Sequence, residues 1–269
     1  MLRIVVPGGP LLLFVSVALA GDVGSVGPVS GPDGLRVEER VVPWAEFGFV
    51  PAAQEQKAIG PDRVAAGADG LAAVWDPVRQ QVLVLHDLVV QGAFAASRVD
   101  DLAFAGRDLV LLEGRTIALV GADGRDHGNL PVPDLVPTNI DLLVQGSDVW
   151  GVDPFGNRHA IAHVEGGLSV ATGASFGGPA FAKVEVTPRA GALKTSVRTL
   201  GAGWAIVDSV VSDFPIGVER AVVHDGRSLP LETRSRSWTP ADDADVDAEG
   251  RLVVIVPLAD GLHVRRISQ

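Results

Sequence analysis

The sequence predicts an all-β fold, a single five-bladed β-propeller built from four-stranded blades. Short apolar runs follow one another along the chain, and turn-forming residues bound each run, as is typical of strands. Val64, Leu102 and Leu142 stand at matching places about forty residues apart, which is the period of a propeller blade. The last repeated unit lacks one strand, and the N-terminal part of the chain contains one strand that belongs to no other unit.

The pattern of apolar runs and polar turns recurs five times, over residues 63–94, 101–124, 140–166, 196–235 and 244–268. The fifth unit contains only three candidate strands. The missing outer strand has a candidate in "LRVEERVVPW", residues 35–44. We expect this N-terminal strand to pair into the last blade, because that pairing would close the ring and remove exposed sheet edges.

Two alternatives to this fold stay open. The fourth unit is longer than the others, with insertions around residues 172–193 and 212–217, so a ring of six blades is one alternative. An irregular β-sandwich also has short, regularly spaced strands. It does not predict that the last unit lacks one strand while the N-terminal part of the chain has one additional strand. No stretch beyond the N-terminal segment sustains the apolar spacing of a helix, so we expect almost no helix.

The N-terminal residues predict export. Residues 1–20 combine one basic residue, an apolar stretch and the small residues Ala18 and Ala20, which is the pattern of a cleavable signal peptide. An N-terminal anchor is the alternative, although the apolar stretch is shorter than the roughly 20 residues that span a bilayer. Residues 21–34, rich in Gly, Pro and Ser, predict a flexible linker, and residues 35–269 a propeller domain in the periplasm or outside the cell.

The composition excludes several classes of function. The chain has a formal net charge of −11, which argues against binding to nucleic acid or to anionic membrane surfaces. It contains no Cys, so neither thiolate catalysis nor a Cys-based zinc site is available. We expect no membrane span once the signal peptide is removed.

Two of the units resemble repeats of the NHL and YVTN type. The matching stretches are "VAAGADGLAAVWDPVRQQVLVL" and "LLVQGSDVWGVDPFGNRHAIA". Repeats of this type carry an Asp-Gly turn, an apolar strand that ends in Asp, a polar turn and a second apolar strand. The corresponding Asp residues are Asp76 and Asp153, while the second unit has Glu113 at this place. The resemblance implies a propeller fold and is compatible with many functions.

Four aspartates precede or begin innermost strands of the predicted ring, namely Asp62, Asp101, Asp141 and Asp245. If they point inward, they form an acidic ring at the channel mouth, which would suit Ca²⁺ or a cationic ligand. The alternative is that Asp is simply a preferred turn residue before a strand. A calcium-dependent hydrolase of the lactonase or glycosidase kind is therefore the alternative function, with calcium as its cofactor.

The sequence contains no catalytic constellation, and we expect no cofactor for the leading function. Phe155 and Phe214 each lie in a loop between second and third strands, where together they would form an apolar contact patch. In the alternative interpretation, these aromatic residues fill the gaps between blades. The leading hypothesis is a non-enzymatic interaction module of the cell envelope that binds a protein partner or another envelope component. A small-molecule sensor that uses the central channel is a third hypothesis.

Overall fold

The computed structural model describes residues 25–30, 34–47, 60–171, 184–186, 188–213, 216–231, 234–235, 243–258 and 260–269. Within these residues the chain is all-β, and helical geometry is confined to short 3-10 turns such as η2 (Ala68–Gly70). No helix in this part of the chain is both long and apolar enough to cross a membrane. The predicted signal peptide, residues 1–20, lies outside the described residues.

The strands of the described residues form five antiparallel sheets, which we number in the chain order of their innermost strands. Sheet 1 contains β3 (Arg63–Ala66), β4 (Leu71–Asp76), β5 (Gln81–His86) and β6 (Val89–Ala95). Sheet 2 contains β7 (Asp101–Ala105), β8 (Asp108–Glu113), β9 (Thr116–Gly121) and β10 (Asp126–Pro131). Sheet 3 contains β11 (Asp141–Gln145), β12 (Asp148–Val152), β13 (Arg158–Val164) and β14 (Leu168–Val170).

Sheets 4 and 5 come from the two least regular units. Sheet 4 contains β15 (Lys194–Thr199), β16 (Trp204–Asp213), β17 (Ile216–His224) and β18 (Arg227–Pro230), with β19 (Arg234–Ser235) beside β17. Sheet 5 contains β20 (Ala244–Val246), β21 (Leu252–Pro257), β22 (Leu262–Ser268), β2 (Arg36–Val42) and β1 (Ser25–Ser30). The first four predicted units therefore each provide the four main strands of one sheet, whereas the fifth provides three strands that β2 and β1 extend.

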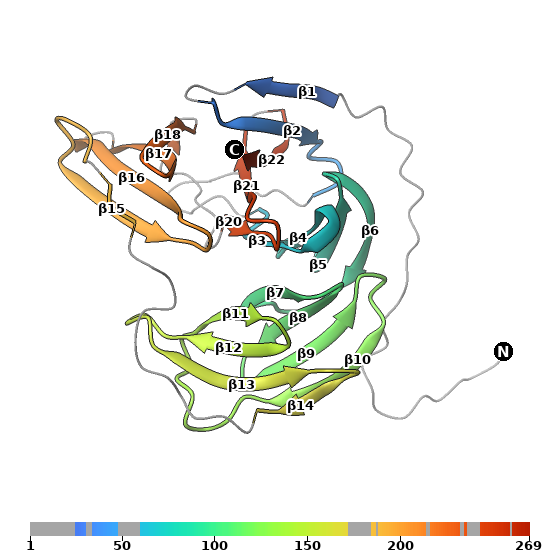
Figure 1. Ribbon diagram of the computed structural model, residues 1–269. Coiled ribbons are helices and arrows are strands. Elements are labelled where there is room, and N and C mark those ends of the chain that lie inside the picture. Colours follow the sequence, from blue (N-terminus) through green and yellow to red (C-terminus); the bar gives the residue numbers. More distant parts are fainter. Residues whose placement is uncertain are drawn as a thin grey trace.

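The N-terminal strand completes the last sheet, as predicted from residues 35–44. Strand β2 pairs with β22 along its whole length, from Arg36 opposite Ser268 to Val42 opposite Leu262. Trp44 follows this strand, and its indole Nε1 donates a hydrogen bond to the carbonyl of Leu258, 3.1 Å away. The two ends of the described chain are thus held in one sheet, and Figure 1 shows β2 beside β22.

Part of the predicted linker over residues 21–34 is a strand. Strand β1 pairs antiparallel with the outer edge of β2, with Ser25 opposite Arg40 and Ser30 opposite Arg36. The prediction of a linker relied on the lack of large apolar side chains to bury. An added edge strand does not need that burial, because its backbone N–H and C=O groups pair with those that the edge of β2 leaves open.

The sheets are arranged around a common centre (Figure 1). Innermost strands of four sheets contact one another in the order β20, β3, β7 and β11. Between neighbouring sheets lie four clusters of buried apolar side chains, which join sheets 5 and 1, 1 and 2, 2 and 3, and 4 and 5. No such cluster joins sheets 3 and 4 within the described residues.

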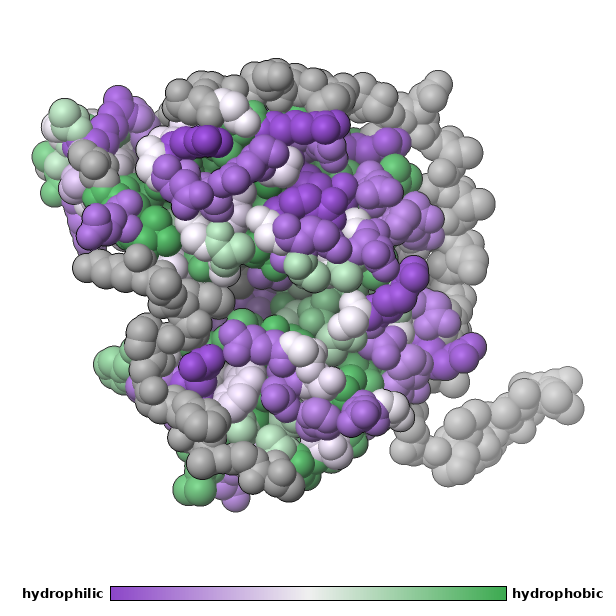
Figure 2. Space-filling view, viewed as in Figure 1, coloured by the Kyte–Doolittle hydropathy of each residue, from purple (hydrophilic) through white to green (hydrophobic). Residues whose placement is uncertain are grey.

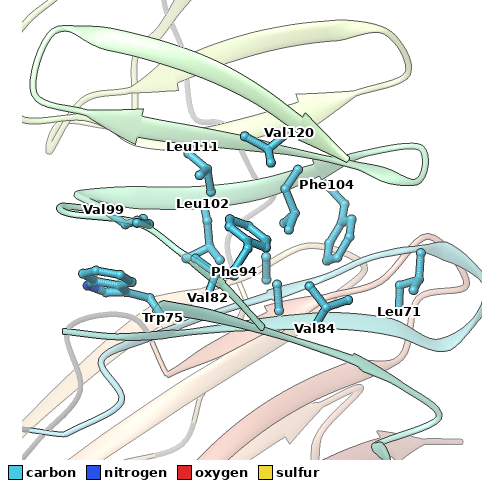
Figure 3. Close-up of a cluster of buried hydrophobic side chains, with 14 residues drawn as sticks. Leu71, Trp75, Val82, Val84, Phe94, Val99, Leu102, Phe104, Leu111 and Val120 are labelled. Atoms are coloured by element: carbon cyan, nitrogen blue, oxygen red, sulfur yellow. The ribbon is translucent and has the colours of Figure 1, made fainter. Parts of the chain in front are cut away.

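The cluster between sheets 1 and 2 shows how closely these faces pack (Figure 3). Trp75 and Val84 from sheet 1 meet Leu102 and Phe104 from sheet 2. The ring of Phe104 lies over Gly67, where an added Cβ would come within 2.7 Å of the ring. A larger residue at Gly67 would therefore push the two sheets apart.

Sheet 4 is fixed to sheet 5 by a buried charge network as well as by apolar contacts. Asp243, only 1% exposed, forms ion pairs with Arg220 and with Arg198. Arg220 also pairs with Asp208 through two of its nitrogens, and Trp204 Nε1 donates to the carbonyl of Gly250, 2.8 Å away. Because Asp243 directly precedes β20, this network ties sheet 4 to the innermost strand of sheet 5.

Candidate functional site

Antiparallel pairing assigns the loops to two rims of the molecule. Asp101 pairs with Leu112, and Asp141 pairs with Val152. The starts of innermost strands therefore lie at the same rim as the loops that follow the second strands. We call this rim the Asp141 rim. The other one, where β3 ends and β13 turns into β14, is the opposite rim.

Asp101 connects three sheets at the Asp141 rim. Its carboxylate is 2% exposed, accepts a hydrogen bond from the backbone N–H of Leu142 and faces Arg63 Nη1 at 3.3 Å. Arg63 begins β3, Asp101 begins β7 and Leu142 lies in β11, so one carboxylate links the innermost strands of sheets 1, 2 and 3. This contact explains the residue type structurally, since a buried carboxylate requires such partners.

Asp245 also links two innermost strands, β20 and β3, but at the other end of β3. Its Oδ2 accepts from the backbone N–H of Ala66 at 2.8 Å, and Oδ1 accepts from the N–H of Val246 at 2.8 Å. Ala66 ends β3, whereas Arg63, the partner of Asp101, begins it. Asp101 and Asp245 therefore act at opposite ends of β3, and the structure does not gather the four predicted aspartates into one ring.

The other two aspartates of the expected ring differ in their surroundings. Asp62 is partly buried, and its backbone N–H donates to the carbonyl of Trp75, 3.0 Å away. Asp141 is exposed, and within the described residues it forms no ion pair and no side-chain hydrogen bond. In the same part of the chain, no group of three or more His, Asp and Glu side chains is arranged to hold a metal ion.

Asp76 and Asp153 shape equivalent turns. Asp76 Oδ1 accepts from the backbone N–H groups of Val78 and Arg79. Asp153 Oδ1 accepts from the N–H of Phe155 and of Asn157, both at 2.9 Å. The side-chain amide of Asn157, with backbone N–H and His159 donors, lowers the pKa of Asp153 to about 2. Both aspartates are buried, so they position the turn and do not themselves present a ligand-binding group.

A cavity of about 410 Å³ opens at the Asp141 rim. It is lined by Arg63, Arg98, Asp100, Leu112, Gly114, Arg115, Thr138, Asn139, Ile140 and Asp141. A second cavity, of about 250 Å³, lies between the innermost strands and is lined by residues that include Asp101, Phe104, Gln145 and Asp245. Figure 2 shows the surface hollowed near the centre of the sheets. Asp141 therefore lines one cavity, and Asp101 and Asp245 line the other.

Two large apolar side chains at the Asp141 rim are almost fully exposed. Phe155, in the turn that Asp153 shapes, is 89% exposed, and Leu135, in the loop from β10 to β11, is 95% exposed. Phe214, the other predicted member of the apolar patch, lies outside the described residues. Leu135 was not predicted. Its signal in the sequence is weak, because it stands between Asp134 and the buried Val136 in a proline-rich loop.

Comparisons with known proteins place the chain near several solved structures at low identity. No family model and no curated protein matches the sequence. BamB from Moraxella catarrhalis is 10% identical, with 91% of this chain and 98% of that chain covered and a TM-score of 0.33. Streptogramin B lyase is 9% identical over 82% and 97% of the two chains, with a TM-score of 0.42. The WD40 repeats of RRP9 are 11% identical over 93% and 96%, with a TM-score of 0.37.

Proposed function

We propose that the chain is an exported five-bladed β-propeller of NHL or YVTN-like repeats that acts as an interaction module and binds a protein partner at its Asp141 rim. In this proposal, residues 1–20 are a signal peptide and residues 35–269 form the propeller domain, in the periplasm or outside the cell. The single observation that carries the binding function is the exposure of Leu135 and Phe155 in two loops at the same rim. Large exposed apolar side chains on rigid loops are typical anchors of protein interfaces.

Sheets 2 and 3, which hold the two loops, support their role as a display scaffold. The backbone N–H of Phe155 donates a hydrogen bond to the buried Asp153. Val132, Val136 and Ile140 fix the loop around Leu135 by packing into the apolar cluster of sheets 2 and 3. Both side chains are therefore presented on an ordered backbone, which lowers the entropy lost on binding.

The hydrolase alternative has less support from the geometry. Asp101 and Asp245 bind backbone N–H groups of neighbouring strands, and Asp76 and Asp153 bind those of their own turns. These contacts use the carboxylate oxygens that a Ca²⁺ ion would require. We therefore expect no rise in the melting temperature on addition of calcium. A rise that the variant Asp141→Asn abolishes would instead favour the metal-dependent function.

A photo-crosslinking experiment tests the interaction directly. The amino acid p-benzoyl-phenylalanine replaces Phe155 or Leu135 in cells that produce the protein, and Glu165 serves as a control position. Glu165 is 84% exposed and lies at the opposite rim. We expect the same crosslinked protein from positions 155 and 135 and none from position 165. Absence of a crosslink at both apolar positions, or an identical product at all three, would overturn the proposed function.

A further inference from the structure

The three arginines that line the 410 Å³ cavity at the Asp141 rim are already engaged within the molecule. Arg63 faces Asp101, and Arg98 Nε lies 2.8 Å from Asp100 Oδ1. The guanidinium of Arg115 donates to the backbone carbonyls of Val132, Pro133 and Val136, the closest at 2.5 Å. These three arginines line the 410 Å³ cavity, yet their charges serve to hold the loops of the Asp141 rim in place.

The negative groups beside the two apolar side chains are not engaged in this way. Asp134 directly precedes Leu135 and is exposed. Asp141 pairs with Val152, the residue before the turn that carries Phe155. Within the described part of the chain, neither Asp134 nor Asp141 forms an ion pair or a side-chain hydrogen bond. Asp134 is thus adjacent to Leu135 in the chain, and Asp141 lies opposite Val152, three residues before Phe155.

A third carboxyl group lies at this rim and would respond to a positive partner. Glu113 ends β8, next to Gly114 and Arg115 of the cavity. Burial, and then the charge of Asp100, raise the pKa of Glu113 above its ordinary value. The charged form of Glu113 is therefore disfavoured in the free protein, and a positive group brought to the cavity would stabilise it.

We propose that the partner presents an apolar segment that also carries Lys or Arg side chains, and that these pair with Asp134 and Asp141 while the apolar groups cover Leu135 and Phe155. This inference rests on the proposed function. Covering the two apolar side chains removes water from the neighbouring carboxylates. A neutral or acidic segment would leave those charges without compensation, whereas a basic segment replaces the lost water.

Three synthetic peptides serve as probes of this preference. Each has twelve residues with the same two Leu and two Phe, and the four variable positions are all Lys, all Gln or all Glu. Binding of fluorescein-labelled peptide to the full chain is measured by fluorescence anisotropy at low and at physiological salt. We expect the Lys peptide to bind about tenfold more tightly than the Gln peptide, with a difference that shrinks as salt increases, and the Glu peptide to bind most weakly.

Matched variants separate this site from general attraction to an acidic protein. The variant D134N/D141N removes two charges at the Asp141 rim, and the control D69N/E165Q removes two at the opposite rim, where Asp69 and Glu165 are exposed. We expect only D134N/D141N to reduce Lys-peptide binding to the level of the Gln peptide. The variant L135S/F155S is expected to weaken binding of the Lys peptide and of the Gln peptide.

The outcomes distinguish the two proposals. Equal binding of the Lys, Gln and Glu peptides, or an equal loss in D134N/D141N and D69N/E165Q, would overturn the basic character of the partner. If L135S/F155S still weakened binding in that case, the apolar interaction site would stand. Absence of binding by all three peptides would also overturn this inference, while the crosslinking result would decide the proposed function independently.

Discussion

Sheets 1 and 3 derive from the two units that carry Asp76 and Asp153 at corresponding places, yet they are buried to very different extents. All six residues of β4 in sheet 1 are buried, whereas β12, the equivalent strand of sheet 3, has two buried residues among five. Trp75 and Trp150 lie in these second strands. Trp75 is 4% exposed within the cluster of sheets 1 and 2, and Trp150 is half-buried beside Arg158.

The difference between sheets 1 and 3 comes from their neighbours. Sheet 1 packs on both faces, against sheet 5 and against sheet 2. Sheet 3 shares an apolar cluster with sheet 2 on one face, and within the described residues it shares none on the other. A repeat therefore predicts the strand order of a sheet, whereas we expect the number of packed faces to determine how much that sheet contributes to stability. The exposed side chains Leu135 and Phe155 both lie next to the sheet that packs on one face.

The largest expected effect comes from replacing the two tryptophans. Trp75→Ala removes a side chain from a core packed on all sides, and we expect a loss of about 3–5 kcal/mol in the free energy of unfolding. Trp150→Ala should cost less than half as much, because Trp150 is only partly buried, with Arg158 over its ring at 5.9 Å from the ring centre. Urea unfolding of both variants measures the difference. Equal losses would show that sheet 3 is packed on both faces in solution.

The next effect concerns Asp101, which joins sheets 1, 2 and 3. Asp101→Ala leaves Arg63 and the N–H of Leu142 without this acceptor, and we expect a loss of about 2–3 kcal/mol in the free energy of unfolding. Asp141→Ala, at the equivalent place in sheet 3, should change stability by less than about 0.5 kcal/mol. Urea unfolding again provides the measurement. A large loss of stability in Asp141→Ala would contradict the exposed position of the Asp141 side chain.

Asp153 should make the stability of sheet 3 depend on acid. The pKa of Asp153 is about 2 in the folded protein, below its ordinary 3.8, because of the hydrogen bonds from Asn157 and neighbouring donors. A lowered pKa stabilises the fold fully above about pH 4, and this contribution is lost as the pH falls toward 2. The stability gap between the wild type and Asp153→Asn should therefore be greatest at neutral pH and shrink on acidification. Urea unfolding at several pH values measures it, and a constant gap would refute the expectation.

The smallest effect is expected at His163, on the exposed side of sheet 3. Asp148, 2.8 Å from the ring, and then Glu165 raise the pKa of His163 above 6.5. A raised pKa contributes stability below about pH 6.5, and this contribution disappears as the pH rises through the folded value. His163→Gln should thus lower the melting temperature slightly near pH 6 and not at all near pH 9. A difference in melting temperature between the wild type and His163→Gln that grew with increasing pH would contradict this expectation.

The repeating parts of the fold were the predictable ones. Short apolar runs and a period near forty residues placed sheets 1 to 3, and the strand surplus at residues 35–44 predicted the pairing of β2 with β22. The Asp at the end of the second strand in these repeats also follows a local rule, since Asp76 and Asp153 bind N–H groups within their own turns. Local hydrogen bonding and periodicity are properties that a sequence displays directly.

Contacts between sheets were not predictable in the same way. The carboxylate of Asp101 binds Leu142, and that of Asp245 binds Ala66, which is 179 residues away in the chain. Nothing near Asp101 or Asp245 in the sequence distinguishes such a link from a channel-lining ligand. The exposure of Leu135 also depends on contacts between sheets. Val132, Val136 and Ile140 in the same loop are buried in the cluster of sheets 2 and 3, and Leu135 is left outside it.

The pairing of β2 with β22 also has a consequence for the order of folding. Glu39 of β2 contacts His263 of β22, and these residues are 224 positions apart. Sheets 1, 2 and 3 contain only local strand pairings and can form while the rest of the chain is still being made. Sheet 5 must wait until β22 exists, and joining β2 to β22 then costs the closure entropy of the segments that are still unfolded. Folding of this molecule should therefore end, slowly, with the joining of its first strands to its last.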